Sequence, residues 1–161
     1  MNKIELLNHK KFPKRLPEKP TFKAMKKGKL PKPFKTMGGH RMHSTELISV
    51  SDTHSIIFIW RDGPELTDAA FFGWMLCQLQ NNNLYPVFEM HYHPNHKGLH
   101  CKLPCKTELD YTNRQLPSAP ELDLNVQSGL DPRVELDREK LILKFCNSCG
   151  ISVGNVNELW K

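Results

Sequence analysis

The chain has 161 residues, of which 39% are hydrophobic, and a formal net charge of +6 at pH 7. A chain of this length predicts one domain with an appendage or with a small second module. Its longest nearly unbroken apolar run, Ala69–Cys77, has nine residues, whereas a membrane-spanning helix needs about 20. The sequence therefore excludes a transmembrane helix and predicts a protein without a membrane partner.

Positive charge is concentrated in residues 1–39. This segment holds eleven lysines and one arginine against two glutamates, whereas the other 122 residues hold 11 basic and 15 acidic side chains. Such a segment favours nucleic acid as the partner, through contacts that depend on salt but not on base sequence. An acidic protein is the alternative partner. The candidate nucleic-acid-binding residues are Lys10, Lys11, Lys14, Arg15, Lys23, Lys26, Lys27, Lys29, Lys32 and Lys35.

Residues 10–39 also contain five prolines, a density that is incompatible with a helix or a central strand. The segment is predicted to be either a disordered tail or an extended arm that lies along nucleic acid or along its own domain. Phe12, Phe22 and Phe34 are interleaved with the lysines and favour the arm, because aromatic side chains can anchor it. Gly38 marks the expected hinge.

The cysteines and the first residues bear on the cellular compartment. The chain has five cysteines, and residues 1–11 lack the apolar stretch of a secretory leader. An odd number of cysteines without a leader predicts reduced thiols and a cytoplasmic protein.

The middle of the chain predicts two strands followed by a helix. Residues 40–50 and 55–60 surround a polar turn, and the second run is apolar on both faces, as expected for a central strand. Thr67 or Asp68 can cap a helix that runs to about Gln80. Because this helix would be apolar around most of its circumference, we expect it to be buried against the sheet.

The C-terminal part predicts a helix that starts near Asp137 and ends at Gly150, followed by a short helix within residues 153–161. Residues 104–120 show no periodicity and predict a long loop, and residues 122–126 predict a short edge strand.

The predicted fold class is α+β, with a small antiparallel or mixed β-sheet, one buried helix packed on it, a C-terminal helix pair and an extended basic N-terminal arm. The predicted division of the chain is an arm over residues 1–39, an α+β core over 40–130 and a helical segment over 131–161.

Residues 87–103, VFEMHYHPNHKGLHCKL, predict a β-hairpin, because residue types alternate on both sides of a turn at residues 94–98. Directly opposed side chains in such a pair are about 4.5–5.5 Å apart at Cβ. One face would carry three histidines, a carboxylate and a lysine, and the other face would be apolar. The expected cross-strand pairs are His93 with Gly98, His91 with His100, and Glu89 with Lys102.

Three interpretations of this hairpin are open. The first is an exposed polar face without a site. The second is a site for a divalent metal cofactor, in which three imidazoles bind the ion and one position stays open. Its candidate metal ligands are Glu89, as a ligand or a supporting carboxylate, and His91, His93 and His100.

The third interpretation needs no metal. One histidine acts as a base and another as an acid, while Lys102 and Arg114 stabilise the negative charge that develops on a reacting oxyanion or phosphorane. Tyr111 would donate a hydrogen bond. The candidate catalytic residues are therefore His91, His93, His100, Lys102, Tyr111 and Arg114.

The triplet His91-Tyr92-His93 resembles the histidine–hydrophobic–histidine signature of single-strand nickases and relaxases over these three residues. The resemblance implies a histidine pair on a central strand, a divalent metal bound by that pair, and a tyrosine that attacks a phosphodiester. Tyr111 would be that tyrosine. In the family the middle residue is usually aliphatic, and the tyrosine lies on a helix with a lysine three residues on, where this chain has Arg114.

The C-terminal residues 142–161 resemble a helix-turn-helix DNA-binding motif. Cys146 is the small residue inside the first helix, Gly150 lies in the turn, and Val156 is an apolar position of the second helix. Two helices packed as an ordinary hairpin are the alternative explanation.

Cys146 and Cys149 also have the spacing of a zinc knuckle, which Cys101 and Cys105 would complete. The alternative is that they are structural thiols, because both occupy apolar positions of the predicted helix.

Together these patterns predict a small cytoplasmic protein that cleaves phosphodiester bonds in nucleic acid, with the size and layout of mobile-element or toxin-like nucleases. One alternative is a non-enzymatic DNA- or RNA-binding regulator that uses the arm and the C-terminal helices. Another is an accessory factor that binds an acidic protein.

Overall fold

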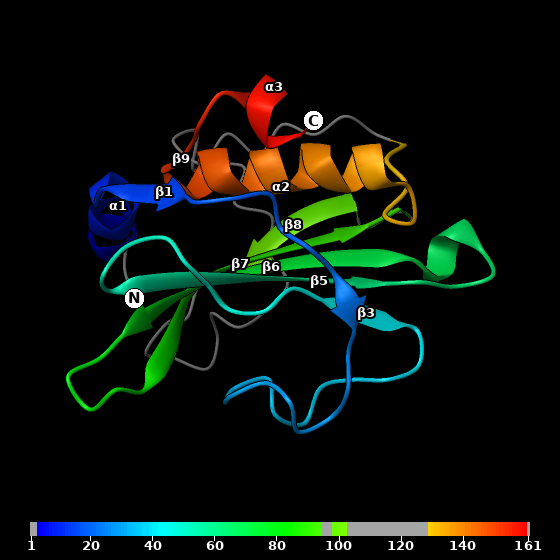
Figure 1. Cartoon of the computed structure of the whole chain (residues 1–161), viewed down its shortest axis with the longest axis horizontal. Helices are drawn as coiled ribbons and strands as arrows, with labels where there is room; N and C mark the ends of the chain where they lie inside the picture. The colour runs from blue at the N-terminus through cyan, green and yellow to red at the C-terminus, as the bar shows by residue number, and fades with distance from the viewer. Residues whose placement is uncertain (1–2, 95–97, 103–128, 161) are drawn as a thin grey trace.

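The computed structural model describes residues 3–94, 98–102 and 129–160. The elements in chain order are α1 (Lys3–Lys11), β1 (Lys14–Leu16), β2 (Lys23–Ala24), β3 (Met42–Ser44), β4 (Ile48–Ser49), β5 (His54–Arg61), the 3-10 helix η1 (Leu66–Asp68), β6 (Ala70–Gln78), β7 (Leu84–His93), β8 (Gly98–Lys102), α2 (Glu135–Cys149), β9 (Ile151–Val153) and α3 (Val156–Leu159). Figure 1 shows one central sheet with α2 lying across one of its faces.

The central sheet has seven strands in the order β2-β3-β5-β6-β7-β8, with β4 paired to β5 beside this path. All of its pairs are antiparallel. Strands β1 and β9 form a separate parallel pair, which joins the two ends of the described chain. The fold is therefore mixed α+β, as the sequence predicted, but it consists mostly of sheet, whereas the sequence predicted only a small one.

The helix predicted from Thr67 or Asp68 to Gln80 is wrong, because residues 70–78 form strand β6 between β5 and β7. Its side chains are apolar on both faces because both faces are covered, and this pattern alone does not distinguish a buried helix from a buried strand. Gly73 lets α2 approach closely, since a Cβ there would lie 2.7 Å from Cδ2 of Phe145.

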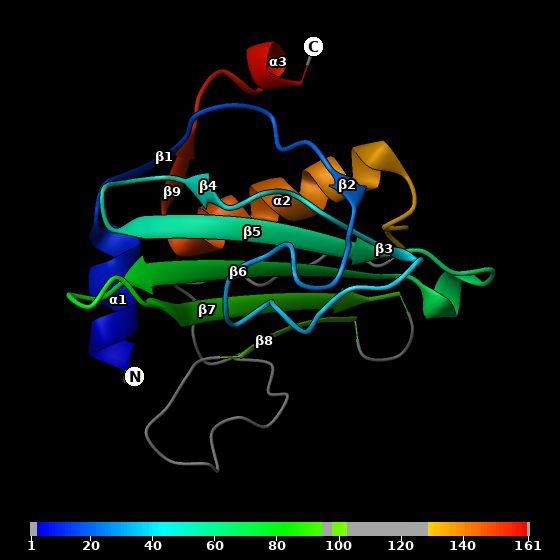
Figure 2. The ribbon, with the colours of Figure 1, turned by 60° about the horizontal axis from the view of Figure 1, so that its bottom comes forward.

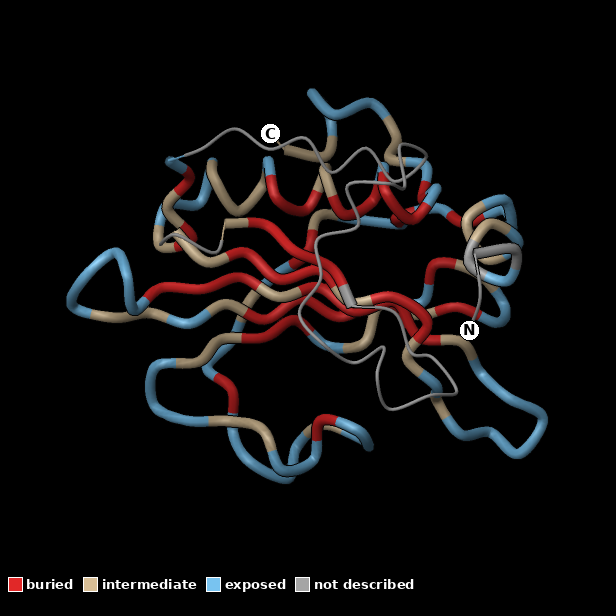
Figure 3. The backbone as a smooth tube through the Cα atoms, turned by 180° about the vertical axis from the view of Figure 1, so that it is seen from behind, coloured by how far each residue is buried: buried red, intermediate tan, exposed pale blue. Residues whose placement is uncertain are grey.

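The helix that packs on the sheet is α2, near the C-terminus. Phe145 makes edge-to-face contact with Phe58 at 5.1 Å between ring centroids and lies 5.7 Å from Phe88. The predicted end at Gly150 is confirmed, because this residue has a left-handed φ of 66° and its N–H donates to the carbonyls of Asn147 and Cys146. Figure 3 shows that buried residues follow the strands and the sheet-facing side of α2.

The resemblance to a helix-turn-helix motif is overturned. Residues Ile151–Val153, which directly follow the expected turn glycine Gly150, are strand β9 and pair in parallel with β1. The following helix α3 has only four residues, Val156–Leu159. The short final helix is present, but β9 separates it from α2, so the two helices do not form the compact pair that reads DNA.

The basic segment folds over its own domain. Met25 and Phe34 are buried against Ile57, Trp74 and their neighbours on the sheet face opposite α2. In Figure 2 the chain between β2 and β3 crosses in front of the strands. The expectation of a disordered tail does not describe this segment, and the alternative of an arm anchored on the domain by phenylalanine fits Phe34.

Two remaining expectations from the sequence concern residues 104–126 and the membrane. The long loop over residues 104–120 and the edge strand over residues 122–126 lie outside the described residues. Within the described part of the chain, none of the helices has the length and apolar composition that crossing a membrane requires.

Replacement of Phe34 by alanine should lower the free energy of unfolding by about 3–5 kcal/mol, because this ring is 1% exposed and its loss leaves a cavity. Phe12 is the matched control, since it belongs to the same segment but is 42% exposed. Phe12→Ala should cost less than about 1 kcal/mol. Urea denaturation of the two variants measures the difference, and equal costs would contradict the packing of residues 25–37 on the sheet.

Candidate functional site

The histidine hairpin has the predicted register. Strands β7 and β8 are antiparallel, and all three predicted cross-strand pairs are observed: His93 with Gly98, His91 with His100, and Glu89 with Lys102. The opposite face is apolar, as expected, and joins the core that contains α2. Its buried residues on the hairpin include Phe88, Met90, Tyr92, Leu99 and Cys101.

His91, His93 and His100 form a cluster on the sheet face opposite α2. Each offers one ring nitrogen, and the three ligand atoms lie within 4.8 Å of one another. The rings of His93 and His100 are stacked, with centroids 5.2 Å apart and an interplanar angle of 12°. Because His91 is 9% exposed and His100 is 5% exposed, the interpretation as an exposed polar hairpin does not fit.

Glu89 supports the cluster from the same strand. Its Oε2 lies 3.2 Å from Nε2 of His91. A carboxylate partner keeps the proton on that nitrogen and places the lone pair on Nδ1, which is how an outer carboxylate orients a metal-binding imidazole. Among the described residues, Glu89 is not part of the group whose ligand atoms lie within 4.8 Å, so its position suits a supporting role better than a ligand.

Strand β6 provides an aromatic wall that the sequence did not predict. Phe72 contacts the rings of His91 and His93 edge-on, at 5.0 and 5.8 Å between centroids. The ring centroids of Trp74 and His91 are 5.7 Å apart. The sequence predicts a helix for the segment that carries these side chains. Only the pairing of β6 with β7 places them beside the histidines. The wall shields the imidazoles from water on one side.

The basic segment and the cluster share a sheet face. Phe34 contacts Trp74 edge-on at 5.2 Å between ring centroids, and Trp74 in turn contacts His91. The segment anchored by Phe34 therefore lies next to the wall of the histidine cluster. Its predicted binding residues are all exposed: Lys23, Lys26, Lys27, Lys29, Lys32 and Lys35.

The predicted nucleic-acid-binding residues around α1 and β1 differ in their exposure to solvent. Lys11 and Arg15 are exposed and Lys10 is half-buried. Lys14, in contrast, is 4% exposed. Its Nζ donates to the carbonyls of Lys10 and Phe12 at 3.2 and 2.7 Å, and also to the carbonyl of His9. This ammonium therefore closes the C-terminal end of α1, and it is not on the surface where a polyanion would meet it.

Three predicted residues are not brought into the site by what the structure describes. Lys102 is placed only by its backbone, opposite Glu89 in the register of β8. Tyr111 and Arg114 lie outside the described residues, as does Cys105.

The described cysteines of the proposed zinc knuckle are core thiols. Cys101, Cys146 and Cys149 are all buried, and burial raises the pKa of Cys101 and of Cys146 to about 12. It also raises the pKa of Cys149. Within the described part of the chain, none of the three belongs to a group of converging metal ligands, which favours the interpretation as structural thiols.

The fold and the cluster define an α+β protein that carries three converging imidazoles on an antiparallel hairpin. No protein-family model, no curated protein and no solved structure matches the chain. The function is therefore argued from the site alone.

Replacement of Cys146 and Cys149 by alanine should lower the free energy of unfolding by about 1–3 kcal/mol, because two buried sulfur atoms leave small cavities. Bound zinc should not change, because neither thiol belongs to a ligand group within residues 3–94, 98–102 and 129–160. Denaturation and metal analysis of the purified double variant measure both quantities. Zinc that is stoichiometric in the wild type and absent from this variant would restore the knuckle interpretation.

Proposed function

We propose that this protein is a cytoplasmic, metal-dependent phosphodiesterase that acts on nucleic acid. The observation that carries the proposal is the cluster of His91, His93 and His100, whose ligand atoms lie within 4.8 Å of one another on two adjacent strands. Three imidazoles with one open position are the ligand set of many catalytic metal sites.

A divalent metal at this position would polarise a phosphoryl oxygen and lower the pKa of a bound water toward neutrality. The protein's own residues prepare the site for it. Glu89 holds His91 through Nε2. The rigid pairing of β7 with β8 sets His91 opposite His100, and Phe72 and Trp74 exclude water from one side.

The exposed lysines between β2 and β3 support a polyanionic substrate. They lie on a segment that is anchored by Phe34 beside the aromatic wall. Lysines so placed attract a phosphate backbone toward the histidines without reading its bases. Strand β7 is paired on both sides, with β6 and with β8, which is one feature of the central strand that the resemblance to relaxases implies, although only β8 lies beyond it in the described sheet.

Replacement of His91 or His100 by alanine should reduce cleavage of a labelled oligonucleotide at least 100-fold. The double variant should lose little more, because ligands of one site act as a unit. His40→Ala is the matched control, since His40 is exposed and belongs to neither group of converging ligands. Circular dichroism of each variant tests whether the fold is kept.

The effect of a chelator separates the two mechanisms. Loss of cleavage with chelator and recovery with a divalent ion are the expected results. Cleavage that persists in chelator, with a bell-shaped pH profile in the histidine range, would instead favour acid–base chemistry by the imidazoles. Binding without any cleavage would replace the enzyme by the alternative of a nucleic-acid-binding regulator.

Lys26→Gln combined with Lys27→Gln should weaken oligonucleotide binding and reduce the slope of log K against log salt by about 1–2, because each phosphate contact contributes about 0.7–0.9. The charge-matched control replaces Lys140 and Lys144 of α2, which lies on the other face of the sheet. Filter binding at several salt concentrations measures both slopes. Equal changes in the two pairs would show that these lysines do not mark the binding face.

A further inference from the structure

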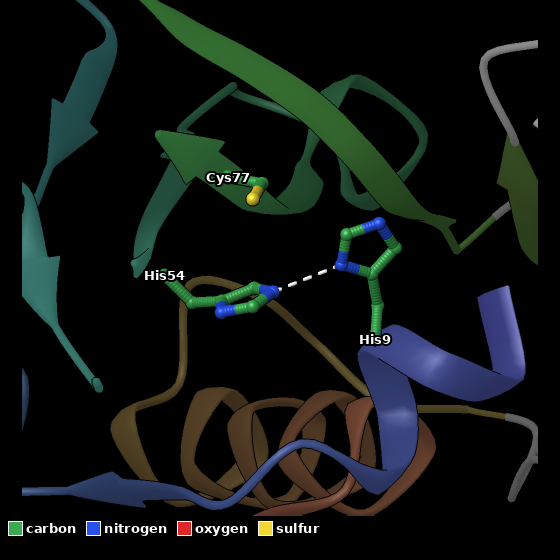
Figure 4. A group of neighbouring side chains, drawn as sticks. All are labelled: His9, His54 and Cys77. Carbon is green, nitrogen blue, oxygen red and sulfur yellow. Dashed lines mark hydrogen bonds between the residues drawn. The ribbon is translucent and has the colours of Figure 1, made fainter. Parts of the chain in front are cut away.

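His9, His54 and Cys77 form a second group of potential metal ligands, drawn from three elements that are far apart in the sequence. His9 lies on α1, His54 begins β5, and Cys77 lies near the end of β6, where it is the cross-strand partner of His54. Figure 4 shows the two rings and the thiol converging on one point beside α1. Cys77 packs with the core that contains α2, so this group and the histidine hairpin lie on opposite faces of the sheet.

The geometry suits a small tetrahedral ion. Nδ1 of His9 and Nε2 of His54 are 2.9 Å apart, and the three ligand atoms lie within 4.8 Å of one another. A tetrahedral zinc ion holds nitrogen and sulfur ligands about 3.3–3.6 Å from one another. Small rotations of the side chains are therefore sufficient to close the group around an ion.

The outer nitrogen of His54 has partners that can hold its proton. Nδ1 lies 3.0 Å from Oγ1 of Thr53 and 3.2 Å from Oγ of Ser51. A hydroxyl oxygen can accept a hydrogen bond from Nδ1–H, which leaves the lone pair of Nε2 directed at His9. Outer hydrogen bonds of this kind fix the tautomer of a metal-binding histidine.

The surroundings also keep both imidazoles neutral, which is the form that binds metal. Burial and the neighbouring Lys14 and His9 lower the pKa of His54 to about 4. Burial and Lys14 lower the pKa of His9, while Glu5, one helical turn earlier, acts in the opposite direction. The Lys14 ammonium, which opposes a cation, is itself held by carbonyls at the C-terminal end of α1.

We propose that His9, His54 and Cys77 bind a zinc-class divalent ion and that this ion fastens α1 to the ends of β5 and β6. Two imidazole nitrogens and one thiolate are a ligand set that zinc favours, and the fourth position is open to water. As the sulfur–metal bond forms, the Cys77 thiol releases its proton to solvent, so binding one ion releases one proton.

Cobalt(II) is the probe for this site, because it occupies tetrahedral zinc sites and a cobalt–thiolate bond produces a charge-transfer band in the near ultraviolet. Among the described residues, the cluster on the histidine hairpin contains no cysteine, so cobalt bound by its three imidazoles does not produce this band. The reduced full-length protein is titrated with cobalt. Because the histidine hairpin can also take up cobalt without producing the band, the band should saturate by two equivalents, and it should disappear when zinc displaces the cobalt.

Three variants test the assignment of the ligands. Cys77→Ser should abolish the band, and His9→Gln should weaken the apparent cobalt affinity at least 10-fold, whereas His40→Gln should leave both unchanged. Absence of the band in the wild type, its persistence in Cys77→Ser, or an unchanged affinity in His9→Gln would each overturn the proposal.

Thermal unfolding gives a second readout that does not depend on the colour of cobalt. Zinc should raise the Tm of the wild type, since an ion that binds only the folded state stabilises it, and Cys77→Ser should respond less. His93→Asn keeps this comparison separate from the proposed phosphodiesterase. That variant should lose cleavage while it retains the cobalt–thiolate band. Loss of the band in His93→Asn would contradict the proposal that the two metal sites are independent.

Discussion

Strand β6 is covered on both faces, by α2 on one side and by residues 25–37 on the other, and the arrangement of the molecule depends on this burial. Gly73 admits the ring of Phe145 on the first side, and Trp74 meets Phe34 on the second. The same strand carries Phe72 beside His91 and Cys77 beside His54. One buried strand thus borders both groups of converging ligands: its pairing with β7 places Phe72 beside His91, and its pairing with β5 sets Cys77 opposite His54.

The basic segment, residues 1–39, combines exposed charged side chains with apolar side chains that are buried in the domain. Most of its described lysines are exposed, whereas Leu16, Met25 and Phe34 are buried. The prolines allow both, because an extended chain can bury isolated apolar side chains while its charged neighbours point outward. The lysines of residues 23–35 are consequently carried by a segment that is anchored on the sheet face of the histidine cluster.

The hairpin could be predicted because every signal for it is local. Alternation sets the face, the turn sets the register, and an error of one residue would move all of the histidines to the apolar side. The segment from Ala70 to Gln78 had no such signal, since an apolar run gives no period to distinguish strand from helix. Likewise, the sequence gives no local signal for strand β9 at Ile151–Val153, because its strand partner, β1, lies more than 100 residues earlier in the chain.

The sequence by itself determined the hairpin, its face of three histidines, the C-terminal helix that ends at Gly150 and the asymmetry of charge, because these depend on neighbours within about 20 residues. Only the tertiary structure decided that the basic segment folds over the sheet, that Phe72 and Trp74 wall the cluster, and that His9 reaches His54 and Cys77. Those contacts join residues of different elements that are 17 to 68 positions apart, and they form only when burial of apolar surface outweighs the conformational entropy of closing the loops between them.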